Sequence, residues 1–215
     1  MAAAPERRRV PPGQVVTHGW PILHAGTVPY ERTPANWTLR IRGSVDRPTD
    51  LTFADLLRLP QQEETVDVHC VTSWTKLGMR WQGVPFRALA ETVRPLPEAL
   101  FVVMECEQGF TTSLPLEALM EPDVLIAHTV DGGPLPAEHG GPVRMLVPQR
   151  YFYKSAKWLQ GLRFLPKDEP GFWEVRGYSN VADPWKETRY DVDDVRVIHR
   201  MRKRSLFQRL GGPGE

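Results

Sequence analysis

The chain has 215 residues, of which 41% are hydrophobic and 25% are charged, so its composition is that of a folded globular protein and excludes a disordered or fibrous one. Its 27 Lys and Arg residues nearly balance its 26 Asp and Glu residues, and the overall charge therefore does not favour binding to nucleic acid or to an anionic membrane. The 21 prolines and 17 glycines indicate many turns and short elements, which favours a β-rich or α+β fold over a helical bundle.

The N-terminal residues are basic, but no apolar run follows them. Three arginines at 7–9 precede Val-Pro-Pro, whereas a secretory or twin-arginine signal needs an apolar region at this place. No stretch approaches the roughly 20 apolar residues of a transmembrane helix. We therefore expect a disordered tail over 1–16, one domain over 17–190 and a basic tail over 191–215, in a cytoplasmic protein. In that compartment both cysteines are expected to be reduced thiols.

The first half of the chain alternates between short strands and short helices. Residues 37–43 alternate between apolar and polar and end on glycine, which predicts a strand followed by a turn. Residues 51–57 predict a short strand entering a short helix. A second alternating strand is expected over 64–70 and a second short helix over 85–92.

The second half adds mainly strands. Residues 100–106 form a continuous apolar run typical of a buried strand, and one or two helical turns follow at 115–120. We expect strands at 124–130 and 143–147, a hairpin turn at 131–133 and a final element at 158–164. Since the chain has no repeat and no internal linker, a single mixed α+β domain is predicted.

Cys70 lies where the strand predicted over 64–70 gives way to a loop. A thiol at such an exit is well placed to act as a metal ligand or as a nucleophile. The alternative is a small buried core residue, because free cysteine is among the most buried residue types.

Two later segments combine positive charge with aromatic side chains. Arg144 follows a Gly-Gly-Pro turn, and Lys154, Ser155 and Lys157 lie among large aromatic residues further along the chain. Guanidinium, ammonium and hydroxyl groups near a tight loop suit a phosphate, and aromatic side chains can form walls for a flat heterocycle. These residues therefore indicate a site for an anionic, ring-containing ligand.

Each of these residues also has a purely structural alternative. Lys154 and Lys157 could lie on a solvated loop face. Arg144 could form a surface ion pair, for example with Glu138, and His139 could be a loop histidine that is hydrogen bonded to the backbone.

Four segments in order resemble the molybdopterin-binding domain of the sulfite oxidase family, including the catalytic subunits of bacterial protein-methionine-sulfoxide reductases. They are Asp-Val-His-Cys at 67–70, Trp-Gln-Gly-Val-Pro at 81–85, the run from Gly133 to Arg144, and Ser-Ala-Lys-Trp-Leu at 155–159. The resemblance extends over about 21–183. It implies a sulfite-oxidase-type α+β fold with mixed sheets and short helices.

The resemblance also implies a molybdenum centre, held by the dithiolene of molybdopterin and by one protein thiolate. Cys70 stands at the position of that thiolate. The residues at the positions that hold the molybdopterin and its phosphate are His139, Arg144, Ser155, Ala156 and Lys157.

Three further residues are expected to contact the cofactor by the same resemblance. His24 falls where relatives have a cofactor-contacting asparagine, and Thr27 ends the same segment. Cys106 lies where one branch of the family has a cofactor-contacting threonine, with a core cysteine as the alternative.

The sequence departs from the sulfite oxidases near the expected substrate pocket. His128 stands where they have an active-site tyrosine; facing the metal, it would donate a hydrogen bond or a proton to the reacting oxygen, and the alternative is an interior histidine. Leu23 replaces an arginine, and Thr75 lies in the segment that is rich in arginine in the relatives. Sulfite is a dianion that needs cations, so these departures favour a neutral substrate.

We therefore predict an oxidoreductase that uses molybdopterin and molybdenum for oxygen-atom transfer, reducing S- or N-oxides. Its expected partners are a small oxide or sulfur substrate and an unidentified electron-transfer partner, with no nucleic acid. Sulfite oxidation, a non-catalytic molybdopterin-binding protein, and a metal-free thiol enzyme with Cys70 as nucleophile and His69 or His128 as base remain the alternatives.

Overall fold

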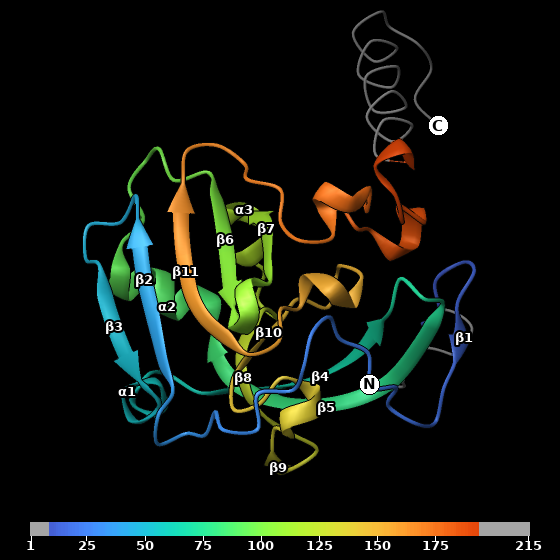
Figure 1. Ribbon diagram of the computed structural model, residues 1–215, viewed down its shortest axis with the longest axis horizontal. Helices are drawn as coiled ribbons and strands as arrows, with labels where there is room; N and C mark the ends of the chain where they lie inside the picture. Colours follow the sequence, from blue (N-terminus) through green and yellow to red (C-terminus); the bar gives the residue numbers. More distant parts are fainter. Residues whose placement is uncertain (1–8, 194–215) are drawn as a thin grey trace, which may run out of the picture.

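The computed structural model describes residues 9–193, which form two β-sheets and three short α-helices (Figure 1). The first sheet has the strand order β3 (Thr49–Thr52), β2 (Thr38–Gly43), β11 (Leu159–Leu165), β6 (Phe101–Cys106) and β7 (Thr111–Pro115). The second has the order β1 (Val15–Val16), β5 (Trp74–Pro85), β8 (Leu125–Val130) and β10 (Arg144–Leu146), with β4 (Gln62–His69) beside β5 and β9 (Gly133–Pro134) beside β8. The α-helices are α1 (Phe53–Arg58), α2 (Phe86–Val93) and α3 (Leu116–Leu119). Short 3-10 turns cover Glu107–Gly109, Ala137–His139, Phe152–Lys154, Glu174–Arg176 and Pro184–Lys186.

The first sheet is built from strands that bury one face. In β2, Leu39 and Ile41 are fully buried, while Arg40 and Arg42, which alternate with them, are exposed, as the period-two pattern predicts. β2 pairs in parallel with β11, and β11 pairs antiparallel with β6, so the sheet is mixed. Its helix α1 begins at Thr52, whose side chain and that of Asp55 cap each other's backbone N–H groups. The predicted α+β class is therefore confirmed.

The core consists of two clusters of buried side chains. The larger one packs the first sheet against α2 and includes Trp37, whose indole N–H donates to the carbonyl of Leu159 at 2.7 Å. The smaller one lies on the second sheet around Trp81 and Phe152. In Figure 1 the first sheet lies at the upper left, and β4 and β5 run along the bottom. The functional residues described below lie next to the smaller cluster.

The structure contains four strands that the sequence did not predict. They are β5, which spans 12 residues, β7, and the two-residue strands β1 and β9. Gly78 and Gly83 interrupt the pattern of β5, and the pairing shifts register between Gln82 and Gly83. A Cβ at position 83 would lie 2.3 Å from the carbonyl oxygen of Ile126, so glycine is needed where β5 passes β8.

The expected boundary between the N-terminal tail (1–16) and the domain differs from the structure. Val15 and Val16 form β1 and pair in parallel with Trp74 and Thr75 of β5, so this part of the chain belongs to the domain. Residues 1–8 and 194–215, which include most of the expected basic tail, lie outside the described residues. No helix within 9–193 combines the length and the apolarity that crossing a membrane requires.

Candidate functional site

A cavity of about 310 Å³ lies between the second sheet, the loop before β11 and the C-terminal part of the described chain. Its walls come from segments far apart in sequence. The lining residues are Trp20, Pro21, Leu23, His24, Ala25, Cys70, Val71, Thr72, Trp74, Phe110, Arg144, Phe152, Tyr153, Ser155, Lys157, Trp158, Trp173 and Tyr178. Most are aromatic or apolar, with one thiol and two cations among them, which is the character of a site for a small organic ligand.

Cys70 is held in a tight turn that joins β4 to β5. Its N–H donates to the carbonyl of Trp74 at 2.8 Å, and its own carbonyl accepts from the N–H of Ser73 at 3.0 Å. Ser73 has a φ of +72°, the left-handed conformation expected in a three-residue hairpin loop. The thiol is reduced and 8% exposed, and it lines the cavity, so the predicted exit from strand to loop is confirmed.

The neighbours of Cys70 favour a ligand over a nucleophile paired with histidine. The hydroxyl of Thr72 donates to Cys70 Sγ at 3.1 Å. His69 points away, with Nδ1 2.9 Å from the hydroxyl of Thr75, and burial lowers its pKa to about 4. An imidazole with so low a pKa is a weak base, which disfavours a Cys–His pair.

Arg144 is a fully buried cation at the back of the cavity. Its Nη1 donates to the carbonyl of His139 and its Nη2 to that of Ser155, both at 2.6 Å, and its guanidinium lies 4.2 Å from the ring centroid of Phe152. The structural alternative, a surface ion pair with Glu138, is not formed. Burial lowers the pKa of Arg144 to about 9, although the group stays charged near neutral pH. Arg144 thus joins two loops of the site, and within residues 9–193 its charge has no carboxylate partner.

Lys157 is the second cation of the cavity. Its Nζ donates to the carbonyl of Glu138 at 2.7 Å and lies 5.5 Å from the ring centroid of Trp158. Burial and, next, the charge of Arg144 lower its pKa to about 7. Gly140 allows this approach, because its φ is +105° and a Cβ there would lie 2.8 Å from the Cβ of Lys157.

The two loops around these cations contain the other predicted residues. Ser155 lines the cavity, and its hydroxyl accepts from the N–H of Val147 at 2.9 Å. Ala156 is buried in the larger core cluster and accepts from the N–H of Met145. The ring of His139 stacks on Trp20, with centroids 3.6 Å apart and planes 5° apart.

His139 contributes a polar atom that the described residues leave unsatisfied. Its Nδ1 is buried with no hydrogen-bond partner among residues 9–193, although His139 itself is not among the residues lining the cavity. Burial lowers its pKa to about 4, with the charges of Lys157 and Arg144 acting in the same direction, so the ring is neutral near pH 7.

The predicted contacts His24 and Thr27 separate in the structure. His24 lines the cavity, and its ring meets that of Trp158 edge to face at 5.6 Å. Thr27 is not among the lining residues and instead pairs with Gln108, which donates to its carbonyl at 2.7 Å and accepts from its N–H at 3.0 Å. Thr27 therefore fastens the loop that carries His24.

Cys106 and His128 do not line the cavity. Cys106 lies in the larger core cluster, and burial raises its pKa, so the core alternative describes it. His128 contacts Gln61 through Nε2 at 2.8 Å and Thr129 through Nδ1 at 2.9 Å, and packs against Phe53. The structure does not bring these two predicted residues together with Cys70.

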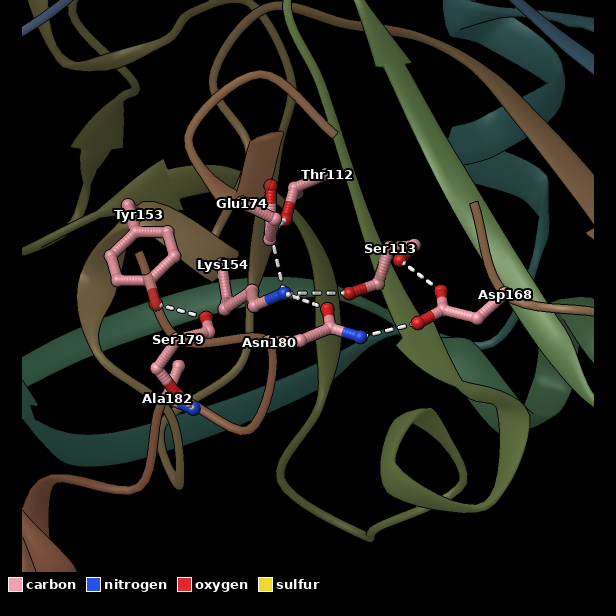
Figure 2. Close-up of polar contacts among 9 residues, drawn as sticks. All are labelled: Thr112, Ser113, Tyr153, Lys154, Asp168, Glu174, Ser179, Asn180 and Ala182. Atoms are coloured by element: carbon pink, nitrogen blue, oxygen red, sulfur yellow. Dashed lines mark hydrogen bonds and ion pairs between the residues drawn. The ribbon is translucent and has the colours of Figure 1, made fainter. Parts of the chain in front are cut away.

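Lys154 belongs to a buried polar network behind the cavity (Figure 2). Its ammonium forms an ion pair with Glu174 and donates to the carbonyl of Ser113 at 2.9 Å and to Oδ1 of Asn180 at 3.0 Å. The hydroxyl of Thr112 donates to the same oxygen of Glu174. Lys154 is therefore neither a solvated loop residue nor a ligand-facing cation.

This network fastens residues 168–183, here termed the strap, to β7 and to the loop before β11. Asp168 accepts from Ser113 and from Asn180, and the hydroxyl of Tyr153 donates to the carbonyl of Ser179 (Figure 2). The strap contributes Trp173 and Tyr178 to the cavity wall. The family resemblance already implies that residues 171–180 cover the edge of the cofactor, whereas no local periodicity marks Trp20, because it lies in an irregular segment.

Together these features suit a flat, anionic ligand that carries a soft metal. Two cations stand in the wall without a carboxylate partner among the lining residues, which favours an anion such as a phosphate. The reduced Cys70 offers the type of sulfur that soft metals prefer. Aromatic side chains provide apolar walls on several sides. The residues present therefore fit a pterin-type metal cofactor.

Comparisons with known proteins agree with this chemistry. Residues 25–173 match the family model described as oxidoreductase molybdopterin binding domain. The chain is 44% identical over 185 residues to the uncharacterized oxidoreductase YuiH of Bacillus subtilis, covering 86% of this chain and 93% of that protein. It is 31% identical over 198 residues to the protein-methionine-sulfoxide reductase catalytic subunit MsrP of Gluconobacter oxydans, covering 81% of this chain and 62% of the relative.

Among solved structures, the chain resembles the sulfane dehydrogenase SoxCD of Paracoccus pantotrophus, with a TM-score of 0.59 and 28% identity. That match covers 63% of this chain and 40% of the SoxCD chain. The chain thus spans less than two thirds of the length of MsrP and of SoxCD, but nearly all of YuiH.

Proposed function

Because this chain belongs to the oxidoreductase molybdopterin binding domain family, we propose that Cys70 is the protein sulfur ligand of the molybdenum that molybdopterin carries. The chain is a molybdopterin-binding oxidoreductase, related to the methionine sulfoxide reductases. We further propose that it reduces small, neutral S- or N-oxides.

The observation that carries this proposal is the placement of Cys70 Sγ in one cavity with Lys157 and Arg144. The sulfur comes from the turn between β4 and β5, and the cations come from β10 and from the loop before β11, so the cavity joins segments far apart in sequence. A thiol alone would be compatible with core packing, and cations alone with any anion. Their combination in one aromatic-walled cavity supports a cofactor that is both metal-bearing and anionic.

The residues divide into a cofactor side and a substrate side. Lys157 and the buried charge of Arg144 would hold the phosphate, Trp158 and His24 would contact the pterin, and Cys70 would hold the metal. When bound, the cofactor supplies the two-electron chemistry of oxygen-atom transfer. Reducing an S-oxide then consumes two electrons from an external donor and two protons, breaks the S–O bond and releases water.

The remaining wall of the cavity supports a neutral substrate. Leu23, Val71 and Phe110 are lining residues, and the cations among the lining residues are Arg144 and Lys157 alone. Lys76, a cation next to Thr75 in sequence, is not a lining residue and donates to the carbonyl of His18. If Arg144 and Lys157 pair with the phosphate of the cofactor, no other cation among the lining residues is left for a dianionic substrate, and a neutral oxide is favoured.

The first experiment tests the sulfur ligand. Protein made in a host that synthesises molybdopterin is analysed for molybdenum content and for its Mo(V) paramagnetic signal. Cys70→Ser should lose the thiolate-type signal and the turnover while keeping the fold, and Cys106→Ser, the matched control, should keep both. A Cys70→Ser protein with an unchanged Mo(V) signal contradicts the assignment.

The second experiment tests the substrate class. Turnover of dimethyl sulfoxide, methionine sulfoxide and sulfite is compared on one loaded preparation, with an artificial electron donor for the oxides and an acceptor for sulfite. We expect oxide reduction with weak or absent sulfite oxidation. The reverse pattern would assign sulfite oxidation to this chain.

A further inference from the structure

Both ends of the described chain converge on the turn that carries Cys70. At the N-terminal end, the side-chain amide of Gln14 donates to the carbonyl of Cys70 at 3.1 Å, and the N–H of Val15 donates to the carbonyl of Ser73 at 2.9 Å. These residues precede the 25–173 region that defines the family match. The sequence segment that supports the Cys70 turn is therefore separate from the matched domain.

Arg189, which follows the family region, holds the same turn from the other side. Its Nη1 donates to the carbonyl of Val71, and its Nη2 donates to the carbonyl of Gly13 at 3.4 Å. The guanidinium also lies 5.1 Å from the ring centroid of Tyr151. The Arg189 side chain thus links three segments: the Cys70 turn, the N-terminal segment at Gly13 and the segment at Tyr151, which directly precedes the lining residue Phe152.

The turn projects from the end of the hairpin, so contacts from outside the hairpin add to its own hydrogen bonds. Thr72 and Ser73 are exposed, and Ser73 adopts a positive φ that a residue with a side chain rarely takes. The hairpin bonds of Cys70 fix its backbone on the β5 side. On the other side, the carbonyl of Cys70 accepts from Gln14 and the carbonyl of Val71 accepts from Arg189. The hydrogen bond from Arg189 is expected to be the stronger one, because its donor is charged.

We propose that Arg189 and Gln14 are positioning residues that fix the Cys70 turn and so hold Cys70 Sγ at its place in the cavity wall. The importance of that place for the metal rests on the proposed function. A ligand atom must be held within a fraction of an ångström, and residues behind the ligand do this in metal sites generally. The competing explanation is that Arg189 only fastens one end of the chain to the other.

The test uses the two cysteines as internal probes. In cofactor-free protein, the rates of alkylation by iodoacetamide at Cys70 and at Cys106 are measured separately by peptide mass spectrometry at fixed pH. Arg189→Met should raise the rate at Cys70 about tenfold, the effect of losing one charged hydrogen bond, and leave the rate at Cys106 unchanged. Gln14→Leu should give a smaller increase in the same direction.

Arg176→Met is the matched control. Arg176 also donates to a carbonyl, that of Phe172, and also stacks on a ring, at 3.8 Å from the centroid of Phe172, but it does not touch the Cys70 turn. Its alkylation rates should equal those of the unaltered protein. Arg189→Lys, which keeps the charge, should recover part of the protection of Cys70.

In loaded protein, the same variants are compared by molybdenum content and Mo(V) spectrum. Arg189→Met should keep the metal, shift the spectrum, and lower kcat with KM unchanged. An unchanged alkylation rate at Cys70, or an equal increase at Cys106, would overturn the positioning role, because the second result means general loosening.

Failure of this inference is distinguishable from failure of the proposed function. The alkylation measurement needs no cofactor, so it reports on the turn whatever the chain binds. If Cys70→Ser keeps its Mo(V) signal while Arg189→Met exposes Cys70, the support of the turn stands and its role toward the metal is overturned.

Discussion

Replacing Lys157 by Met should weaken retention of the cofactor and, at pH 6, raise the free energy of unfolding of the cofactor-free protein. Lys157 is partly buried next to the charge of Arg144, and its pKa is lowered from 10.5 to about 7. The ammonium therefore destabilises the folded, cofactor-free protein, whereas in the loaded protein it would bind the anionic cofactor. Met keeps the length and apolar stem of the side chain and removes the charge.

The magnitude on the cofactor side follows from one charged hydrogen bond, worth about 1.5–3 kcal/mol. Its loss should weaken cofactor retention by roughly 10- to 150-fold. In the unaltered protein, retention should fall as pH rises through about 7, because the ammonium loses its proton. Retention by Lys157→Met should lack this pH dependence.

Lys157→Met should have the opposite effect on the stability of the cofactor-free protein. Since the folded pKa lies below the unfolded value, the unfolded chain binds the extra proton between pH 7 and 10.5, and the free energy of unfolding rises with pH across that window. The upper limit of the rise is roughly 5 kcal/mol. At pH 6, cofactor-free Lys157→Met should therefore resist urea better than the unaltered protein.

The assay combines the molybdopterin-to-protein ratio after repeated dialysis with urea unfolding of cofactor-free protein at pH 6 and pH 9. Lys76→Met is the control, because Lys76 lies outside the cavity. Unchanged retention together with a loss of stability at pH 6 would refute the reasoning and make Lys157 a structural residue.

Three further substitutions test the placements described above. Lys154→Met should lower the free energy of unfolding, measured in urea, by about 3–5 kcal/mol, because it leaves Glu174 buried without its ammonium partner. The double variant Lys154→Met, Glu174→Leu should recover most of this loss. Equal losses in the single and the double variant would contradict the buried pair. Cys106→Ala should cost about 1–2 kcal/mol for a small core cavity and leave molybdenum content unchanged, whereas metal loss would place Cys106 at the cofactor. His128→Gln should keep kcat/KM within about twofold in steady-state turnover, and a drop of about 100-fold or more would show that His128 acts as an acid or base.

Several parts of the fold were predictable because their signals are local. The alternation in β2, the apolar run of β6 and the thiol at the exit of β4 follow from residues near each other in sequence. β5 was missed because its glycines serve a contact with β8, and that contact is invisible in the sequence of β5 alone.

The residues of the candidate site also divide into those that the sequence predicts and those that it does not. Five predicted residues line one cavity: His24, Cys70, Arg144, Ser155 and Lys157.

Other predicted residues lie away from the cavity, and this has a different cause. Position in a motif suggested contacts for Thr27 and His128, but whether a side chain reaches the cavity depends on the twist and register of its segment. Lys154 and Lys157 belong to one basic segment of the sequence, yet Lys154 pairs with the buried Glu174 of the strap whereas Lys157 lines the cavity. The cytoplasmic location and the electron-transfer partner stay predictions.

The buried ion pair of the strap bears on how long the cofactor stays. Lys154 is 0% exposed and Glu174 2% exposed at their side chains, so releasing the strap would move both charges through an apolar interior before water reaches them. Openings that break such contacts require a free energy close to that of global unfolding. The strap, with Trp173 and Tyr178 in the cavity wall, would therefore stay in place while a ligand enters and leaves. Exchange would use the open side of the cavity, and its rate would depend on contacts such as those of Lys157.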